Sequence, residues 1–268
     1  MTRRFLLSLV AIASVASLLL AACGAQAPAA PALTDPKDIL AKTVLSLKDV
    51  KTVEVTGSFT GNVTVPNMGA LDLSTTKLSA AMDIPGKKAK FSLDAPAVLG
   101  TKVDAILLDN VGYVKVSGLL AGTLGLTPDK YKKADIPAPS AAPGASAAAG
   151  DAAQVAEAVT KINEALSKLP TPPTKGADEA CGDQQCYHVT LKVTAADLRA
   201  LDPSVGSQVG NTAGDLALDV WTRRNDLRPA KMSFGVTSPD IGTVTATFEL
   251  KYDGAVTVEA PPADQIAP

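Results

Sequence analysis

The stretch TVEVTGSFTGNVTV, residues 52–65, decides the fold, because apolar and polar residues alternate along its whole length. Every odd position holds an apolar residue or glycine, and every even position holds a polar residue. This period of two is typical of a β-strand with one dry face and one wet face. A strand this long spans about 45 Å if unbroken. It therefore predicts a large antiparallel sheet with one solvated side.

The same alternation returns near the C-terminus, where residues 243–252 carry apolar side chains at Val244, Ala246, Phe248, Leu250 and Tyr252. Shorter alternating runs occupy residues 71–84, 89–93, 101–108, 112–116, 187–193, 216–221 and 230–236. Together these runs predict about nine or ten strands. Apolar positions change parity within residues 71–84, which predicts a β-bulge there. Val256 and Val258 indicate that the last strand continues in a shifted parity.

Three helices are expected beside these strands. Asp35 and Pro36 form a capping residue and a first helical position, and apolar residues at helical spacing follow to about residue 48. A second helix is expected from Asp151 to the residue before Pro170, and a short third helix over residues 195–201. Three helices are few for ten strands. Either the sheet closes on itself, or part of its dry face lines a cavity.

The N-terminus has the pattern of an export signal. Arg3 and Arg4 precede an apolar run that ends at Ala21 and Ala22, directly before Cys23. The run is short for a spanning helix, which needs roughly 20 apolar residues. Residues 20–23, Leu-Ala-Ala-Cys, look like a lipobox, which predicts removal of residues 1–22 and acylation of Cys23 by a fatty acid such as palmitate. The alternative is an ordinary signal peptide cleaved nearby, with an incidental thiol.

The remaining chain is expected to form one domain over residues 35–268. Residues 23–34 are rich in Ala and Pro and predict a tether, so the protein is expected to lie outside the cytoplasm, anchored to a membrane of the cell envelope. Residues 137–150 form a second Ala/Pro-rich stretch, which predicts a flexible linker. Cys181 and Cys186 remain as a pair around a turn, which predicts a disulfide that contributes about 2 kcal/mol.

Composition argues against several classes of function. The net charge is −2 and the basic residues are scattered, so we exclude nucleic acid as a partner and find no footprint for anionic lipid head groups. The single histidine, His188, is expected on the wet face of its strand, facing solvent, which leaves no catalytic triad. We predict no enzyme activity, no cofactor and no metal site. Trp221 fits a cavity rim, a partner surface or a structural contact with a helix.

Several stretches resemble the mycobacterial LppX/LprG lipoprotein family. They are residues 112–116 (GYVKV), 186–189 (CYHV), 216–221 (LALDVW) and 228–231 (RPAK), within a similar order of strands and helices. The resemblance, which extends to LolA, LolB and the sensor domain of RseB, implies an α+β fold. In this fold helices cover the concave apolar face of a strongly curved, half-open antiparallel sheet. It also implies an apolar cavity that in several members takes acyl chains.

The expected function is therefore a membrane-anchored lipoprotein that binds an acyl lipid or glycolipid for transport or presentation. The alternative is a non-enzymatic sensor or scaffold of the envelope with a packed core. Gly57 and Gly61 are expected to leave space on the dry face, although plain core packing explains each residue as well. The candidate lining residues are Val53, Val55, Gly57, Phe59, Gly61, Val63, Phe91, Val244, Phe248 and Leu250.

Overall fold

A computed structural model describes residues 32–65, 69–135, 152–194, 196–197, 214–238 and 242–267 of the 268-residue chain. Residues Thr34–Pro268 form one compact unit. The predicted signal peptide, Cys23, most of the tether and the linker at 137–150 lie outside the described residues. The predicted third helix also lies outside them, apart from residues 196–197.

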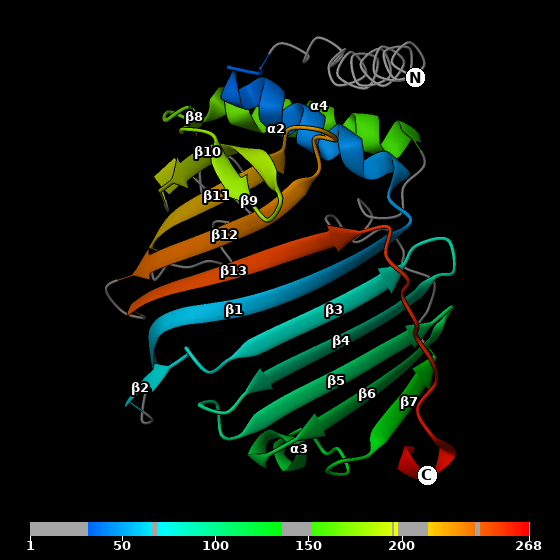
Figure 1. The fold of residues 1–268 in the computed structure, drawn as a ribbon. Coiled ribbons are helices and arrows are strands. Elements are labelled where there is room, and N and C mark those ends of the chain that lie inside the picture. The colour runs from blue at the N-terminus through cyan, green and yellow to red at the C-terminus, as the bar shows by residue number, and fades with distance from the viewer. Residues whose placement is uncertain are drawn as a thin grey trace, which may run out of the picture. The chain divides into compact units, whose positions relative to one another are not determined.

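The described chain is built on one open antiparallel sheet of 13 strands, so the fold is α+β (Figure 1). The strand order along the sheet is β7-β6-β5-β4-β3-β1-β13-β12-β11-β10-β8, with β2 on β1 and β9 on β10. The strands are β1 Thr52–Val65, β2 Gly69–Asp72, β3 Lys77–Asp83, β4 Lys88–Ala95, β5 Thr101–Leu108, β6 Val111–Ser117, β7 Tyr131–Asp135, β8 Thr174–Lys175, β9 Glu179–Cys181, β10 Gln184–Val193, β11 Asp215–Arg223, β12 Pro229–Ser238 and β13 Gly242–Tyr252.

The predicted number of strands was too low, because β2, β7, β8 and β9 have five residues or fewer and carry no clear alternation. Residues 71–84 do not form one bulged strand. β2 and β3 are separate, and the turn between them is closed by a hydrogen bond from the amide of Thr76 to the carbonyl of Leu73. Beyond Tyr252 the chain also leaves the sheet, so the predicted continuation through Val258 was wrong.

Helices cover one end of the sheet. Helix α2 (Pro36–Ser46) begins as predicted, with the Asp35 carboxylate accepting a hydrogen bond from the amide of Lys37 at 2.8 Å. Its buried face contacts the sheet through Thr43, whose hydroxyl lies 2.8 Å from the hydroxyl of Thr222 in β11. Helix α4 (Ala152–Lys168) packs beside α2 at this end (Figure 1). Ile39 of α2 is fully buried there.

Three short helical segments complete the described structure, and the sequence predicted none of them as a separate element. They are the 3₁₀ turns η1 (Leu47–Asp49) and η3 (Ala263–Gln265) and the helix α3 (Leu119–Thr123). The segment after β13 returns to the opposite edge of the sheet, where Ile266 forms a parallel bridge with Tyr131. No helix among the described residues is both long and apolar enough to cross a membrane.

Candidate functional site

Eight of the ten candidate lining residues lie on one face of the sheet: Val53, Val55, Gly57, Phe59, Phe91, Val244, Phe248 and Leu250. The positive φ of Gly61 would turn a Cβ atom toward the carbonyl oxygen of Thr243, and Val63 beyond it pairs with Leu71 of β2. In the β1–β13 register Val55 faces Leu250, Gly57 faces Phe248 and Gly61 faces Val244. Phe91 of β4 joins them because it and Val55 both pair with the same residue of β3, Ala80. Thr222, which contacts α2, belongs to the same face, since the register carries this face across β12 into β11. We call this face the dry face.

An apolar groove of about 180 Å³ opens on the dry face between η1 and the sheet. Three of the predicted residues, Val53, Val55 and Leu250, line it. The other lining residues were not among the candidates; they are Leu47, Val50, Met82, Ile84, Pro229, Met232 and Tyr252. Alternation was the available signal for Met232 and Tyr252, and the helical spacing of the first helix was the signal for Leu47. The groove thus joins β1, β3, β12 and β13 to the end of α2.

Beyond the groove, the dry face carries a row of half-buried aromatic side chains. The ring of Phe248 meets the ring of Phe59 edge to face, with centroids 6.2 Å apart, and meets Phe234 at 5.8 Å. All three rings keep part of their surface exposed. Half-buried rings on the apolar side of a sheet leave apolar area that a ligand or another protein segment could still cover.

The two glycines of β1 do not leave the space expected of them. A Cβ atom at Gly57 would lie 3.0 Å from the Cβ of Leu78 and 3.1 Å from the ring of Phe248, so this position is already packed. Gly61 has a φ of +101°, and a Cβ there would lie 2.0 Å from the carbonyl oxygen of Thr243. Gly61 therefore serves the backbone, at the point where β1 exchanges β3 for β2 as its neighbour.

Tyr252 stands at the end of the groove. Burial raises the pKa of its phenol well above the ordinary value, although Arg223 and Arg228 oppose the shift. The guanidinium carbons of these arginines lie 5.2 and 5.5 Å from the centre of the ring. The hydroxyl is buried and has no hydrogen-bond partner among the described residues. A neutral phenol in this position suits an apolar site rather than a charged one.

The opposite face of the sheet carries a compact polar cluster around His188. Its Nδ1 lies 2.9 Å from Glu179 Oε1, and its Nε2 lies 2.9 Å from Asp219 Oδ1. The Thr190 hydroxyl donates a hydrogen bond to the same Asp219 oxygen at 2.6 Å. The His188 side chain is 18% exposed, so the prediction of a solvent-facing histidine was wrong about its burial, although it named the correct face.

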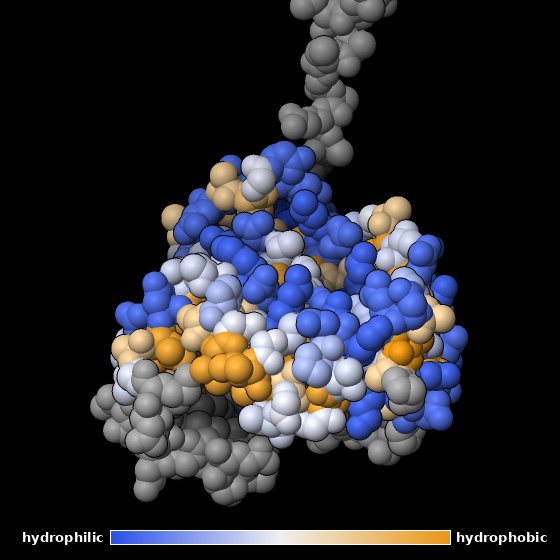
Figure 2. Space-filling view, turned by 90° about the horizontal axis from the view of Figure 1, so that it is seen from below, coloured by the Kyte–Doolittle hydropathy of each residue, from blue (hydrophilic) through white to orange (hydrophobic). Residues whose placement is uncertain are grey.

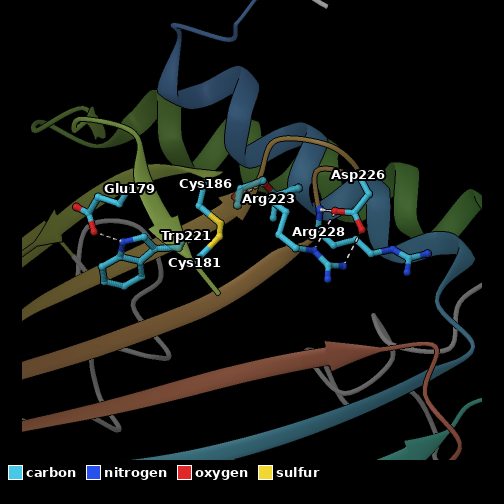
Figure 3. Close-up of a disulfide and its surroundings, with 9 residues drawn as sticks. Glu179, Cys181, Cys186, Trp221, Arg223, Asp226 and Arg228 are labelled. Carbon is cyan, nitrogen blue, oxygen red and sulfur yellow. Dashed lines mark hydrogen bonds and ion pairs between the residues drawn. A yellow bond between two sulfur atoms is a disulfide. The ribbon is translucent and has the colours of Figure 1, made fainter. Parts of the chain in front are cut away.

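Trp221 belongs to this cluster and not to the groove. Its ring stacks on His188 with centroids 4.4 Å apart, and the Lys231 ammonium lies 3.7 Å from the centre of the indole ring. The indole N–H donates to Glu179 Oε2 at 2.8 Å (Figure 3). This bond, with the charge of His188, lowers the pKa of the Glu179 carboxyl. These contacts of Trp221 are therefore with strand residues rather than with a helix, and its side chain also lines a cavity of about 440 Å³ on this face.

The predicted disulfide joins Cys181 and Cys186, whose Cα atoms are 5.9 Å apart. It closes the hairpin of β9 and β10 beside Trp221 (Figure 3). Because Glu179 is the first residue of β9, the bridge holds the carboxylate that binds Trp221 and His188. Among the described residues, no group of three His, Cys, Asp or Glu side chains is placed to hold a metal ion.

Comparisons with known proteins give matches among solved structures alone. No family model matches the sequence, and no curated protein does. The lipoprotein LppX of Mycobacterium tuberculosis is 14% identical, with a TM-score of 0.48, and the match covers 84% of this chain and 98% of LppX. LprF of Mycobacterium bovis is 16% identical, with a TM-score of 0.47, over 84% of this chain and 96% of LprF. A chain of the Pseudomonas aeruginosa MucA/MucB complex is 10% identical, with a TM-score of 0.37, over 87% of this chain and 60% of that one.

The resemblance to mycobacterial lipoproteins that the sequence indicated thus recurs among solved structures.

Proposed function

We propose that this protein binds the acyl chain of a lipid on its dry face, as a non-enzymatic lipoprotein anchored to a membrane through Cys23. The observation that carries the proposal is the apolar groove of about 180 Å³ beneath η1. An engineered apolar cavity of about 150 Å³ in another protein stays dry and binds benzene, so a groove of this size suits about six carbon atoms.

The rest of the ligand would lie along the half-buried aromatic row. A dissociation constant near 1 μM corresponds to about 8 kcal/mol, or roughly ten methylene groups buried at about 0.8 kcal/mol each. The groove alone is too small for ten methylenes. Phe59 and Phe248 continue the same face and offer further apolar area, so a chain longer than the groove gains affinity by extending over them.

The polar cluster does not support an enzyme. His188 has both ring nitrogens directed at carboxylates, and the nearby Thr190 hydroxyl is bonded to Asp219. No nucleophile among the described residues is hydrogen-bonded to the histidine, as acyl-transfer chemistry requires. The lining of the groove, on the other face, has no titratable side chain except Tyr252.

Native mass spectrometry of the gently purified domain tests the proposal. We expect the chain without its signal peptide and with Cys23→Ser to carry co-purified lipid, or to take up a fatty acid added at micromolar concentration. The mass difference would identify the lipid class. A domain that stays free of lipid at every fatty acid concentration, while remaining folded, would contradict the proposal.

A sensor or scaffold with a packed core is the second candidate, and the close packing at Gly57 favours it. Leu78 and Phe248 already fill the space above this glycine. If no lipid binds, this function becomes the better account of the same fold.

The anchoring part of the proposal has its own test. Metabolic labelling with a fatty acid should mark the protein at Cys23, because that thiol stands at the lipobox. The Cys23→Ser variant should remain unlabelled and should accumulate as a soluble form or an uncleaved precursor. Labelling that persists in the variant would show that the acyl group is attached elsewhere.

A further inference from the structure

Exposed leucine side chains gather at one corner of the sheet. Leu119, the first residue of helix α3, is 70% exposed, and Leu124, directly after the helix, is 63% exposed. Leu99, in the loop between β4 and β5, is 40% exposed. The amide of Leu119 bonds to the carbonyl of Leu99, which brings the two loops together. We call residues 96–100 and 118–126 together the leucine tip. Figure 2, which views the molecule from below, shows hydrophobic side chains grouped on a surface that is otherwise mostly hydrophilic or neutral.

The leucine tip is held by close backbone packing. A Cβ atom at Gly118 would lie 2.5 Å from the carbonyl oxygen of Gly100, so the two loops touch through their main chains. Ala121, in the middle of α3, is fully buried. A helix held in place by its buried residue therefore points the leucine side chains into solvent. Exposure of this apolar surface to water is unfavourable.

The apolar surface continues from the leucine tip onto the dry face. Strand β6 runs directly into α3, and its residues Val114 and Val116 belong to the dry face through their pairing with Ala105 and Val103 of β5. Val116 is buried, whereas Val114 remains 40% exposed. A lipid chain leaving a bilayer at the tip would meet the apolar side chains of Val116 and Val114, with Lys132 of β7 beside Val114.

The composition of the leucine tip favours a lipid surface over a protein partner. Residues 96–100 (PAVLG) and 118–126 (GLLAGTLGL) contain no charged and no aromatic residue. Protein interfaces draw their binding energy mainly from Trp, Tyr and Arg, and leucine is under-represented among their hot spots. Leucine side chains on a small amphipathic element are typical of segments that enter the boundary between lipid head groups and acyl chains.

The charges beside the tip are mixed. Lys130, Lys132 and Lys133 are exposed beside the exposed Asp129 and Asp135, so the lysines exceed the aspartates by one. Attraction to anionic lipid would then add little.

We propose that the leucine tip inserts into the surface of a lipid bilayer and passes acyl chains between that bilayer and the dry face. The inference rests on the proposed function for the passage of lipid, whereas the insertion itself does not depend on it.

Vesicle flotation of the chain without its signal peptide, carrying Cys23→Ser, tests the insertion. This form keeps the whole compact unit Thr34–Pro268. We expect it to float with phosphatidylcholine vesicles, and to bind equally well when phosphatidylglycerol is included. Replacing both Leu119 and Leu124 by serine should weaken binding about tenfold per leucine lost from the apolar layer. The matched control is Leu45→Ser on α2, where the leucine is 39% exposed, and it should bind like the parent.

A second measurement separates the tip from the groove. Uptake of a monomeric fluorescent fatty acid in the absence of vesicles should be unchanged in the double variant, whereas transfer from vesicles should slow with the loss of binding. If the probe is never taken up but the leucines still govern flotation, the proposed function fails and the membrane tip stands. The tip is overturned if the parent does not float, or if the double variant floats equally well. It is also overturned if sedimentation shows that the leucines join two copies of the chain.

Discussion

At the residue scale, Gly61 shows that a glycine can hold its place in an alternating strand for a reason other than the one predicted. The alternation of residues 52–65 puts it among the apolar positions of the pattern. Its backbone, however, has a φ of +101°, a conformation that residues with a Cβ rarely adopt. No pattern of apolar and polar residues reports a φ angle, so the sequence could not distinguish a glycine that leaves space from one that lets the backbone turn.

We expect Gly61→Ala to lower the free energy of unfolding by at least about 2 kcal/mol, because the methyl group would meet the carbonyl oxygen of Thr243 in addition to the cost of positive φ. Gly69→Ala is the control. Gly69 also has positive φ, at +80°, but no atom lies within 4 Å of its added Cβ. The Gly69→Ala substitution should lower the free energy of unfolding by about 1 kcal/mol. Urea denaturation measures both, and equal losses would show that the contact with Thr243 does not matter.

At the element scale, strands that alternate over many residues were predictable and short strands were not. The bounds of β1 and β5 agree with their alternating runs, and the capping pair Asp35 and Pro36 fixed the start of α2. Strand β9 has three residues and depends on the disulfide and on pairing with β10, both of which are tertiary features. The groove was predictable in part, because its strand residues alternate, whereas η1 contributes Leu47, which the helical spacing placed in the first helix and not at a groove.

The β9–β10 hairpin makes a prediction that belongs to this scale. Cys181→Ser should lower the free energy of unfolding by about 2 kcal/mol or less, since the bridge closes a small loop. It should also loosen Glu179, so the emission of Trp221, the single tryptophan, should shift to longer wavelength in the folded state.

Reduction of the parent protein should reproduce both effects on stability and on fluorescence. Cys23→Ser, which leaves the bridge intact, is the control. Unchanged emission after reduction would mean that Glu179 stays in place without the disulfide, and global unfolding would mean that the bridge supports far more than one hairpin.

At the scale of the whole molecule, the two faces of the sheet differ in chemistry, one being polar and the other apolar. On the polar face, His188, Glu179 and Asp219 bond to one another beside the hairpin that the disulfide closes. The dry face is covered by α2 at one end and keeps apolar area half-buried along β1 and β13. The proposed lipid site therefore depends on this area together with the groove.

Uptake of a fluorescent acyl probe by two variants of strand β1 tests this claim most directly. Val55→Phe places a ring in the apolar groove, and Thr60→Phe places the same ring on the exposed, polar face of the same strand. We expect Val55→Phe to reduce probe affinity at least about tenfold, the equivalent of losing two buried methylenes. Thr60→Phe should bind the probe like the parent. The free energy of unfolding of each variant should lie within about 1–3 kcal/mol of the parent value. A parent that binds no probe, or a Val55→Phe protein that binds it unchanged, would contradict a lipid site on the dry face.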